Sequence, residues 1–123
     1  MAAMPYAAHL GITLDSATPD EVVGHLEWTE DLTTAAGLLH GGALMSLADT
    51  IGAVCAFLCL PEGANTATTS STTQLVRAVR DGSVTATASP LHRGRRNIVV
   101  QTDLTDARGR LVAQTTQTQA VLT

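Results

Sequence analysis

The stretch HGGALMSLADTIGAVCAFLCLP, residues 40–61, is the one strongly helical part of this 123-residue sequence. Pro61 and then Gly63 end the helix, because proline cannot donate the next helical hydrogen bond. About 20 residues at about 1.5 Å each make a rod about 30 Å long, enough to cross a small domain. Apolar residues occur on every side of this rod, so we expect it to be buried nearly all round.

The segments on both sides of this helix have the composition and alternation of β-strands. Apolar and polar residues alternate in segments 22–28, 84–89 and 97–104, and threonine-rich runs occupy 66–76 and 111–122. Short turn signals join the last four of these segments, which predicts antiparallel pairing among them; the signals lie at 81–82, 93–94 and 106–109. One helix and about five strands predict an α+β fold, in which a curved antiparallel sheet wraps around one long central helix. The length fits a single domain spanning residues 1–123.

Charge is distributed unevenly along the chain. The formal net charge of −4 argues against nucleic acid as a partner. A local arginine cluster in an acidic protein suggests a small anionic ligand such as a phosphate, although a solvated sheet edge explains it equally well. All seven basic residues belong to this cluster: Arg77, Arg80, Arg93, Arg95, Arg96, Arg108 and Arg110.

Three features predict a cytoplasmic protein without a membrane partner. Cys55 and Cys59 stand four residues apart in an apolar run, and we expect them to pack as small hydrophobic residues in a reducing compartment. Residues 1–6 lack a basic segment followed by a long apolar one, so no signal peptide is expected. The longest apolar run, 51–61, is too short to span a bilayer.

Asp49 is the one charged residue between Gly41 and Pro61. A carboxylate inside an apolar helix is costly to desolvate, so it is uncommon unless hydrogen-bonded or used chemically. Its helix face consists mostly of small residues, which would let a ligand approach closely; the face contains Gly42, Met45, Ser46, Asp49, Gly52, Ala53 and Ala56. A helix–helix contact with a structural aspartate remains an alternative.

His40, Gly41 and Gly42 stand at the start of the helix. The first backbone N–H groups of a helix have no partner inside the helix, and the helix dipole adds partial positive charge there. Two glycines leave these donors accessible to a substrate oxygen, as polarisation of a carbonyl requires. A simple turn at the glycines and a structural role for His40 are the alternatives.

The sequence GLLHGGALMSLAD, residues 37–49, resembles the signature of hotdog-fold thioesterases. It is most similar to the branch that contains phenylacetate-pathway and Arthrobacter-type 4-hydroxybenzoyl-CoA thioesterases. Weaker similarity extends over three later segments, 68–78, 94–96 and 109–113. The resemblance implies the hotdog fold and an enzyme that hydrolyses acyl-CoA thioesters to a free acid and coenzyme A.

The resemblance also implies roles for individual residues. Asp49 would attack the thioester carbonyl or activate a water that does so, while the N–H of Gly41 polarises the carbonyl and His40 helps to position it. Thr34 stands where relatives usually carry Asn or Gln, and a hydroxyl there has a shorter reach. Thr68 would be the counterpart of a hydroxyl residue that helps to hold the water in some relatives, or else an ordinary strand threonine.

The family's sites form between two subunits, which supply the carboxylate and the helix N-terminus separately. Along one helix, eight residues separate Gly41 from Asp49, about 12 Å at 1.5 Å each, so the two groups cannot easily act on one carbonyl from the same chain. We therefore expect a homodimer as the minimal unit, with two dimers paired into a homotetramer. We expect no metal and no cofactor, since coenzyme A is part of the substrate.

The expected substrate contacts come from the small helix face and from the arginines. They are Gly42, Met45, Ala53, Arg77, Arg93, Arg95 and Arg96. Arg93, Arg95 and Arg96 surround the Gly94 turn and would bind the phosphates of coenzyme A, and Arg77 could join them; solubilising a hairpin is the alternative role. The segment 75–78, Leu-Val-Arg-Ala, replaces the usual Phe-Leu-Arg-Pro of the family, which leaves the acyl group open.

Two other functions compete with hydrolysis. A hotdog protein could bind acyl-CoA without turning it over. The exchange at Thr34 favours this alternative mildly, whereas the presence of both Asp49 and His40-Gly41-Gly42 argues against it. A hotdog dehydratase would need a histidine and a carboxylate acting as an acid–base pair. The proline-rich segment that dehydratases carry around that histidine is absent from the sequence around His40.

Overall fold

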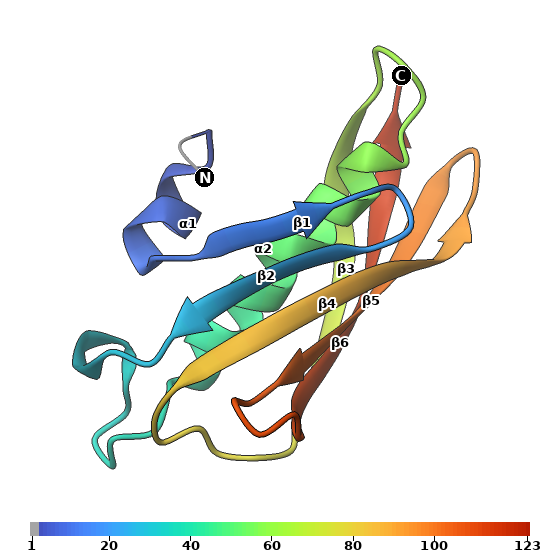
Figure 1. The fold of residues 1–123 in the computed structure, drawn as a ribbon. Coiled ribbons are helices and arrows are strands. Elements are labelled where there is room, and N and C mark those ends of the chain that lie inside the picture. Colours follow the sequence, from blue (N-terminus) through green and yellow to red (C-terminus); the bar gives the residue numbers. More distant parts are fainter. Residues whose placement is uncertain (1–2) are drawn as a thin grey trace.

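The computed structural model describes residues 3–123, so the first two residues of the segment in which we expected no signal peptide lie outside it. One six-stranded antiparallel sheet has the strand order β1-β2-β4-β5-β6-β3, and the helix α2 lies across its concave face (Figure 1). The elements in chain order are α1 (Pro5–Leu10), β1 (Thr13–Ala17), β2 (Val22–Glu27), the 3-10 helix η1 (Glu30–Leu32), α2 (Gly41–Leu58), β3 (Asn65–Leu75), β4 (Ser83–Arg93), β5 (Asn97–Thr105) and β6 (Leu111–Leu122).

The core lies between α2 and the sheet. On the sheet side, alternate residues of β2, β4 and β5 are buried, as the alternation predicted. On the helix side, Leu47, Ile51 and Cys55 are fully buried against them. Each fully buried Leu or Ile contributes about 1.5–3 kcal/mol, so this layer holds the helix against the sheet. The α+β arrangement of a curved sheet around one central helix is confirmed.

The sequence analysis missed two elements near the N-terminus. Strand β1 is exposed along its whole length and lacks the apolar alternation that identified the others, so the count of about five strands was one too low. Helix α1 has only six residues, yet Pro5 stands in its first turn and Gly11 ends it with a left-handed φ of 82°. This pairing of proline at the start and glycine at the end is a signal that the sequence does contain.

The pairing of β3 differs from the expectation. We expected the last four strands to pair in sequence, and β4–β5 and β5–β6 do so as antiparallel hairpins. Strand β3 instead pairs with β6, and β4 pairs with β2. The chain between β3 and β4 crosses the end of the sheet, where the amides of Val76 and Arg77 both donate to the carbonyl of Val112. The composition of a strand does not reveal this crossover.

The helix α2 is buried on one side only, so the prediction of burial all round was wrong for the single chain. Met45 and Phe57 are 45% and 58% exposed on the outer side. Within residues 3–123, α2 is the one helix long and apolar enough to cross a membrane, and it serves here as the central helix of the fold. Its outer face leaves apolar surface and Asp49 open to a ligand or to another chain.

Candidate active site

The loop before α2 is fixed so that the helix begins at Gly41. The indole N–H of Trp28 donates to the carbonyl of Gly37 at 3.0 Å, and Thr33 and Leu39 form an isolated antiparallel bridge. The amide of His40 donates to the carbonyl of Leu32 at 2.9 Å. Together these bonds set the direction in which the chain enters the helix.

His40 is the N-cap of α2. Its Nδ1 accepts a hydrogen bond from the Gly42 amide at 2.8 Å, and its carbonyl accepts the amides of Ala43 and Leu44. An Nδ1 that accepts a hydrogen bond carries no proton, so the neutral ring has its proton on Nε2. Capping by a side chain satisfies one of the free amides at the helix start. This role accounts for His40 independently of any substrate.

The backbone N–H of Gly41 has no hydrogen-bond partner inside the helix. Among the described residues this N–H donates to no acceptor, and the His40 side chain accepts the N–H of Gly42. A Cβ at Gly41 would lie 2.9 Å from Cδ1 of Leu75, so a side chain there would crowd this neighbour. The free amide, at the positive end of the helix dipole, can donate to the oxygen of a bound carbonyl.

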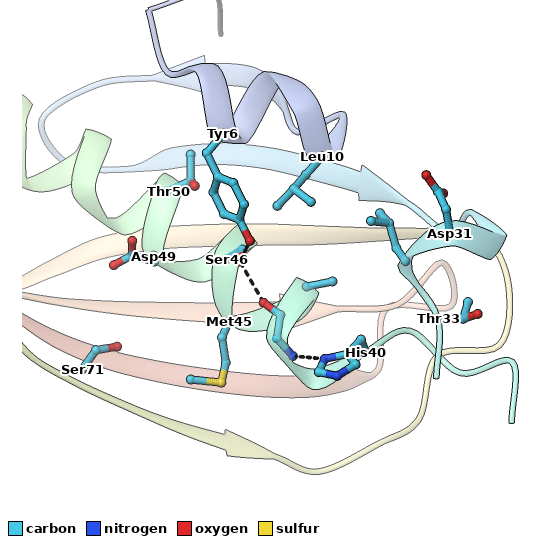
Figure 2. Close-up of a pocket in the computed structure, with 13 residues that line it drawn as sticks. Tyr6, Leu10, Asp31, Thr33, His40, Met45, Ser46, Asp49, Thr50 and Ser71 are labelled. Atoms are coloured by element: carbon cyan, nitrogen blue, oxygen red, sulfur yellow. Dashed lines mark hydrogen bonds between the residues drawn. The ribbon is translucent and has the colours of Figure 1, made fainter. Parts of the chain in front are cut away.

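Asp49 opens into a cavity of about 680 Å³. The cavity lies beside the first turns of α2, and its walls come from α1, η1, β3 and α2 itself (Figure 2). Tyr6 reaches across from α1, with its hydroxyl 3.1 Å from Oγ of Ser46. Of the predicted site residues, His40, Gly42, Met45 and Asp49 line this cavity.

Burial raises the pKa of Asp49 above its usual value, and a hydrogen bond from the side-chain amide of Gln117 partly offsets this rise. The Gln117 Nε2 donates to Oδ1 of Asp49 over a long distance of 3.5 Å. A carboxylate with a raised pKa binds a proton more strongly than an ordinary one, which suits a group that takes a proton from water. The arrangement is therefore compatible with general-base chemistry.

Gly41 and Asp49 do not share a cavity in one chain. Gly41 and Thr34 line a second hollow of about 330 Å³, together with Leu75 and Arg77. The Thr34 hydroxyl accepts the amide of Ala36 at 3.3 Å within its own loop. One chain therefore provides the carboxylate and the free amide on different surfaces.

Thr68 lies outside the cavity that Asp49 lines. Its hydroxyl accepts a hydrogen bond from Nε2 of Gln119 at 2.7 Å. A β-bulge between Thr68 and Ser70 shifts the register, so Ser71 stands opposite Gln117 and is the β3 hydroxyl residue in the cavity wall. Sequence analysis missed Ser71, Gln117 and Tyr6. Gln117 is one of the buried polar residues of β6, and the run of Gln and Thr over residues 114–119 does not show which of them are buried.

The arginines form two groups at opposite ends of β4, instead of one cluster. Arg93 bonds to Asp20 and to the carbonyl of Pro19, and Arg95 and Arg96 are exposed in the turn that follows. Arg77 lies in the connection from β3 to the first residue of β4, at the other end of that strand, so within one chain it does not join them. There it shares a hollow of about 370 Å³ with Arg80, Arg108 and Arg110.

Two remaining features concern ligands. Ala53, expected to contact substrate, is half-buried one turn beyond Asp49 and does not line the 680 Å³ cavity. Across residues 3–123, no three His, Cys, Asp or Glu side chains stand close enough together to hold a metal ion.

A free helix N-terminal amide and an accessible carboxylate are groups that acyl-transfer chemistry can use, and comparison with known proteins identifies the family. The profile of the thioesterase superfamily matches residues 36–113, so the chain belongs to this superfamily. It has the hotdog fold and is a thioester hydrolase.

Individual relatives support this assignment. A thioesterase structure from Haemophilus influenzae superposes with a TM-score of 0.91 at 32% identity, covering 95% of this chain and 82% of that one. A Mycobacterium tuberculosis protein named as an esterase superposes with a TM-score of 0.93 at 31% identity over 97% of both chains. The 1,4-dihydroxy-2-naphthoyl-CoA hydrolase of Escherichia coli is 38% identical over 86 residues, which cover 70% of this chain and 63% of the relative.

The capping role of His40 leads to a prediction about stability. Replacing His40 with Ala removes the side-chain acceptor for the Gly42 amide, which should lower the free energy of unfolding by about 0.5–2 kcal/mol. His40→Asn restores a capping oxygen and should recover most of this loss. Urea unfolding of the three proteins measures the effect; equal stability of wild type and His40→Ala would contradict the capping role.

Proposed function

We propose that this protein is an acyl-CoA thioesterase that hydrolyses its substrate to a free acid and coenzyme A. The observation that carries the proposal is the pair of groups that α2 presents: the unpaired Gly41 amide and the Asp49 carboxylate, which opens into a cavity and whose pKa burial raises. The hydrolase name of the Escherichia coli relative supports a coenzyme A thioester as substrate. The reaction needs no metal and no cofactor beyond the coenzyme A of the substrate, and we place it in the cytoplasm.

In the proposed mechanism, Asp49 removes a proton from a water molecule while the oxygen of that water bonds to the carbonyl carbon of the thioester. The carbonyl oxygen becomes an oxyanion, which accepts a hydrogen bond from the Gly41 amide. When the tetrahedral intermediate collapses, the C–S bond breaks and the thiolate takes the proton from Asp49. Direct attack by Asp49 would instead break the C–S bond, release the thiolate and form an anhydride with the acyl group, which water then hydrolyses to the same products. After a single turnover in ¹⁸O-labelled water, ¹⁸O in the peptide that contains Asp49 would demonstrate the anhydride route.

We propose a homodimer as the catalytic unit, with Asp49 from one chain and Gly41 from the other. The separate cavities of the two groups support this arrangement. So does the open edge of β3, since β3 ends the sheet and pairs only with β6. Antiparallel pairing of two β3 edges would satisfy their backbone groups and place the outer faces of two α2 helices side by side. Pairing of two such dimers would give the expected homotetramer.

The function can be tested directly through release of free thiol, followed with a disulfide reagent. Hydrolysis of an acyl-CoA panel that includes aromatic and aliphatic acyl groups would define the substrate. Binding without release of thiol would favour the non-catalytic alternative, for which the short Thr34 side chain, engaged in its own loop, is the supporting observation.

Asp49→Asn should reduce kcat about 10²–10⁴-fold while the substrate still binds, because the amide is nearly isosteric but cannot accept the proton. Steady-state kinetics on the folded variant measure this change. Wild-type turnover by Asp49→Asn would end the assignment of Asp49 as the catalytic carboxylate.

The two-chain site predicts complementation between inactive variants. Gly41→Pro removes the amide hydrogen at the first helical position, where proline is well tolerated and where His40 already has the extended conformation that a following proline requires. Mixed and refolded with Asp49→Asn, it should form hybrid dimers with one intact site. Since half of a random mixture is hybrid and each hybrid has one of two sites, activity should recover to about a quarter of wild type.

Gly41→Ala is the matched control, because its methyl group meets Leu75 in the same way but the amide remains. It should lose far less activity than Gly41→Pro, for which about 10²–10³-fold is expected. Absence of recovery in the mixed sample, with both variants folded and dimeric by light scattering, would place the complete site within one chain.

The charge of coenzyme A leads to a prediction about the Gly94 turn. Arg95→Ala with Arg96→Ala should raise KM for acyl-CoA and leave kcat mostly unchanged, since guanidinium groups bind phosphate oxygens through paired donors. An acyl-pantetheine substrate, which lacks the nucleotide, should respond little. Arg80→Ala with Arg108→Ala removes the same charge from the other arginine group, so an equal rise in KM there would point to bulk electrostatics instead of a phosphate site at the turn.

A further inference from the structure

Gln117 is a fully buried amide in the layer between α2 and the sheet. Burying an amide costs free energy unless hydrogen bonds replace the lost water. Its neighbours on β6 meet this requirement: the Thr115 hydroxyl pairs with that of Thr73, and Gln119 bonds to Thr66 and Thr68. Gln117 differs from them, because its one partner among the described residues is the Asp49 carboxylate, and its Oε1 has none.

The helix is shaped to admit this side chain. Gly52 stands one turn beyond Asp49, where a Cβ would overlap the Oε1 of Gln117 and lie 3.2 Å from the hydroxyl of Thr102. A glycine inside a helix costs about 0.5–1 kcal/mol relative to alanine. Gly52 stands where the Gln117 side chain passes between the helix and the sheet toward Asp49, so the missing side chain makes room for the Gln117 amide.

We propose that Gln117 is a positioning residue for the proposed reaction, which donates from Nε2 to Oδ1 of Asp49 and directs Oδ2 toward the cavity. The inference rests on the catalytic role proposed for Asp49. A carboxylate on a helix surface can rotate about its side-chain torsions, and one fixed donor selects the orientation that faces the water. The distance of 3.5 Å is long, as is common before a substrate closes the site.

The same bond adjusts the proton affinity of Asp49. Burial raises the pKa of the carboxyl group, and the hydrogen bond from Gln117 lowers it. Removing the donor should therefore raise the pKa further, so that a higher pH is needed to ionise Asp49. The other titratable groups that face the cavity are Tyr6 on α1, Asp31 on η1 and His40 before α2, whereas β3 contributes only Ser71; none of these is altered by a change at residue 117.

Two variants separate positioning from packing. Gln117→Met fills nearly the same volume but cannot donate, and Gln117→Glu keeps the shape but replaces the donor with a second carboxyl group. Two carboxyl groups that share a site raise the pKa of the pair. If Gln117 only fills the core, Gln117→Met should leave the pH profile unchanged, and a shift in Gln117→Glu alone would report the added carboxyl group and not the loss of the donor.

The matched control is Gln114→Met. Gln114 also lies on β6 and also donates to a carboxylate, Oδ1 of Asp103 at 2.8 Å, but that carboxylate lies outside the cavity of Asp49. The control removes one glutamine–aspartate bond from the same strand, so it reports any general effect on β6.

The experiment measures kcat, KM and the acid limb of kcat/KM for the assembled enzyme. Gln117→Met should lower kcat about tenfold with little change in KM, as expected when a hydrogen bond to a charged group is lost. Its acid limb should move to higher pH, and that of Gln117→Glu should move further. Gln114→Met should follow wild type in both respects.

A ¹³C NMR titration of the Asp49 carboxyl carbon gives the same midpoints without relying on activity. Should Gln117→Met fail to fold, Gly52→Ala provides a second route, because its methyl group displaces the Gln117 amide from above. Unchanged midpoints in the folded Gln117 variants, with Asp49→Asn inactive, would overturn the positioning role alone. Full activity of Asp49→Asn would instead overturn the catalytic role proposed for Asp49, and the NMR midpoints would still report whether Gln117 controls the carboxyl group.

Discussion

The packing of α2 into the concave face of the sheet is the constraint on which the rest of the molecule depends. The side of this 18-residue helix that faces the sheet carries apolar residues, and Leu47, Ile51 and Cys55 on that side are fully buried. Once that side is fixed, the helix cannot rotate, so the opposite face and the first turn are fixed too. The positions of Gly41 and Asp49 on the helix are therefore set by the hydrophobic core, and local hydrogen bonds then orient the groups that they carry.

Close packing requires small residues where the helix meets the strands. Gly24 on β2 faces Ile51, and a Cβ there would overlap its side chain and lie 2.7 Å from the carbonyl of Thr13. Gly52 on the helix has the corresponding role toward β6, but it faces a polar side chain. The sheet beneath α2 is thus apolar at β2, β4 and most of β5, and polar at β6, where Thr115, Gln117 and Gln119 are buried. The proposed catalytic carboxylate is on the helix turn above this polar side.

Much of this could be read from the sequence, and the misses have physical causes. Alternation in β2, β4 and β5 reports burial on one face directly. The helix begins after its His40 cap as expected, and it ends at Leu58, shortly before the Pro61 at which the sequence placed its end. Strand β1 and the partner of β3 were missed because exposed strands carry no periodic signal and a crossover leaves no trace in composition. Within the site, Asp49 and the glycines stand out as exceptions in an apolar helix. Ser71 could not be predicted as a residue of the cavity wall, because its place there depends on the register shift of a β-bulge, and no residue type predicts that bulge.

Part of the apolar surface that remains exposed is where the proposed second chain would lie. Met45 and Phe57 are on the outer face of α2, Leu75 ends the edge strand β3 and Val76 follows it, and each is between 45% and 60% exposed. A monomer with three aromatic residues has little other means of enlarging its core. Covering this face would stabilise the fold and exclude water from Asp49, and the lower local dielectric would strengthen the hydrogen bonds that act on the carboxylate and on a developing oxyanion. In the proposed dimer, the surface that stabilises the fold and the surface that carries the chemistry would thus be the same one, and each α2 helix would contribute one group to each of two sites.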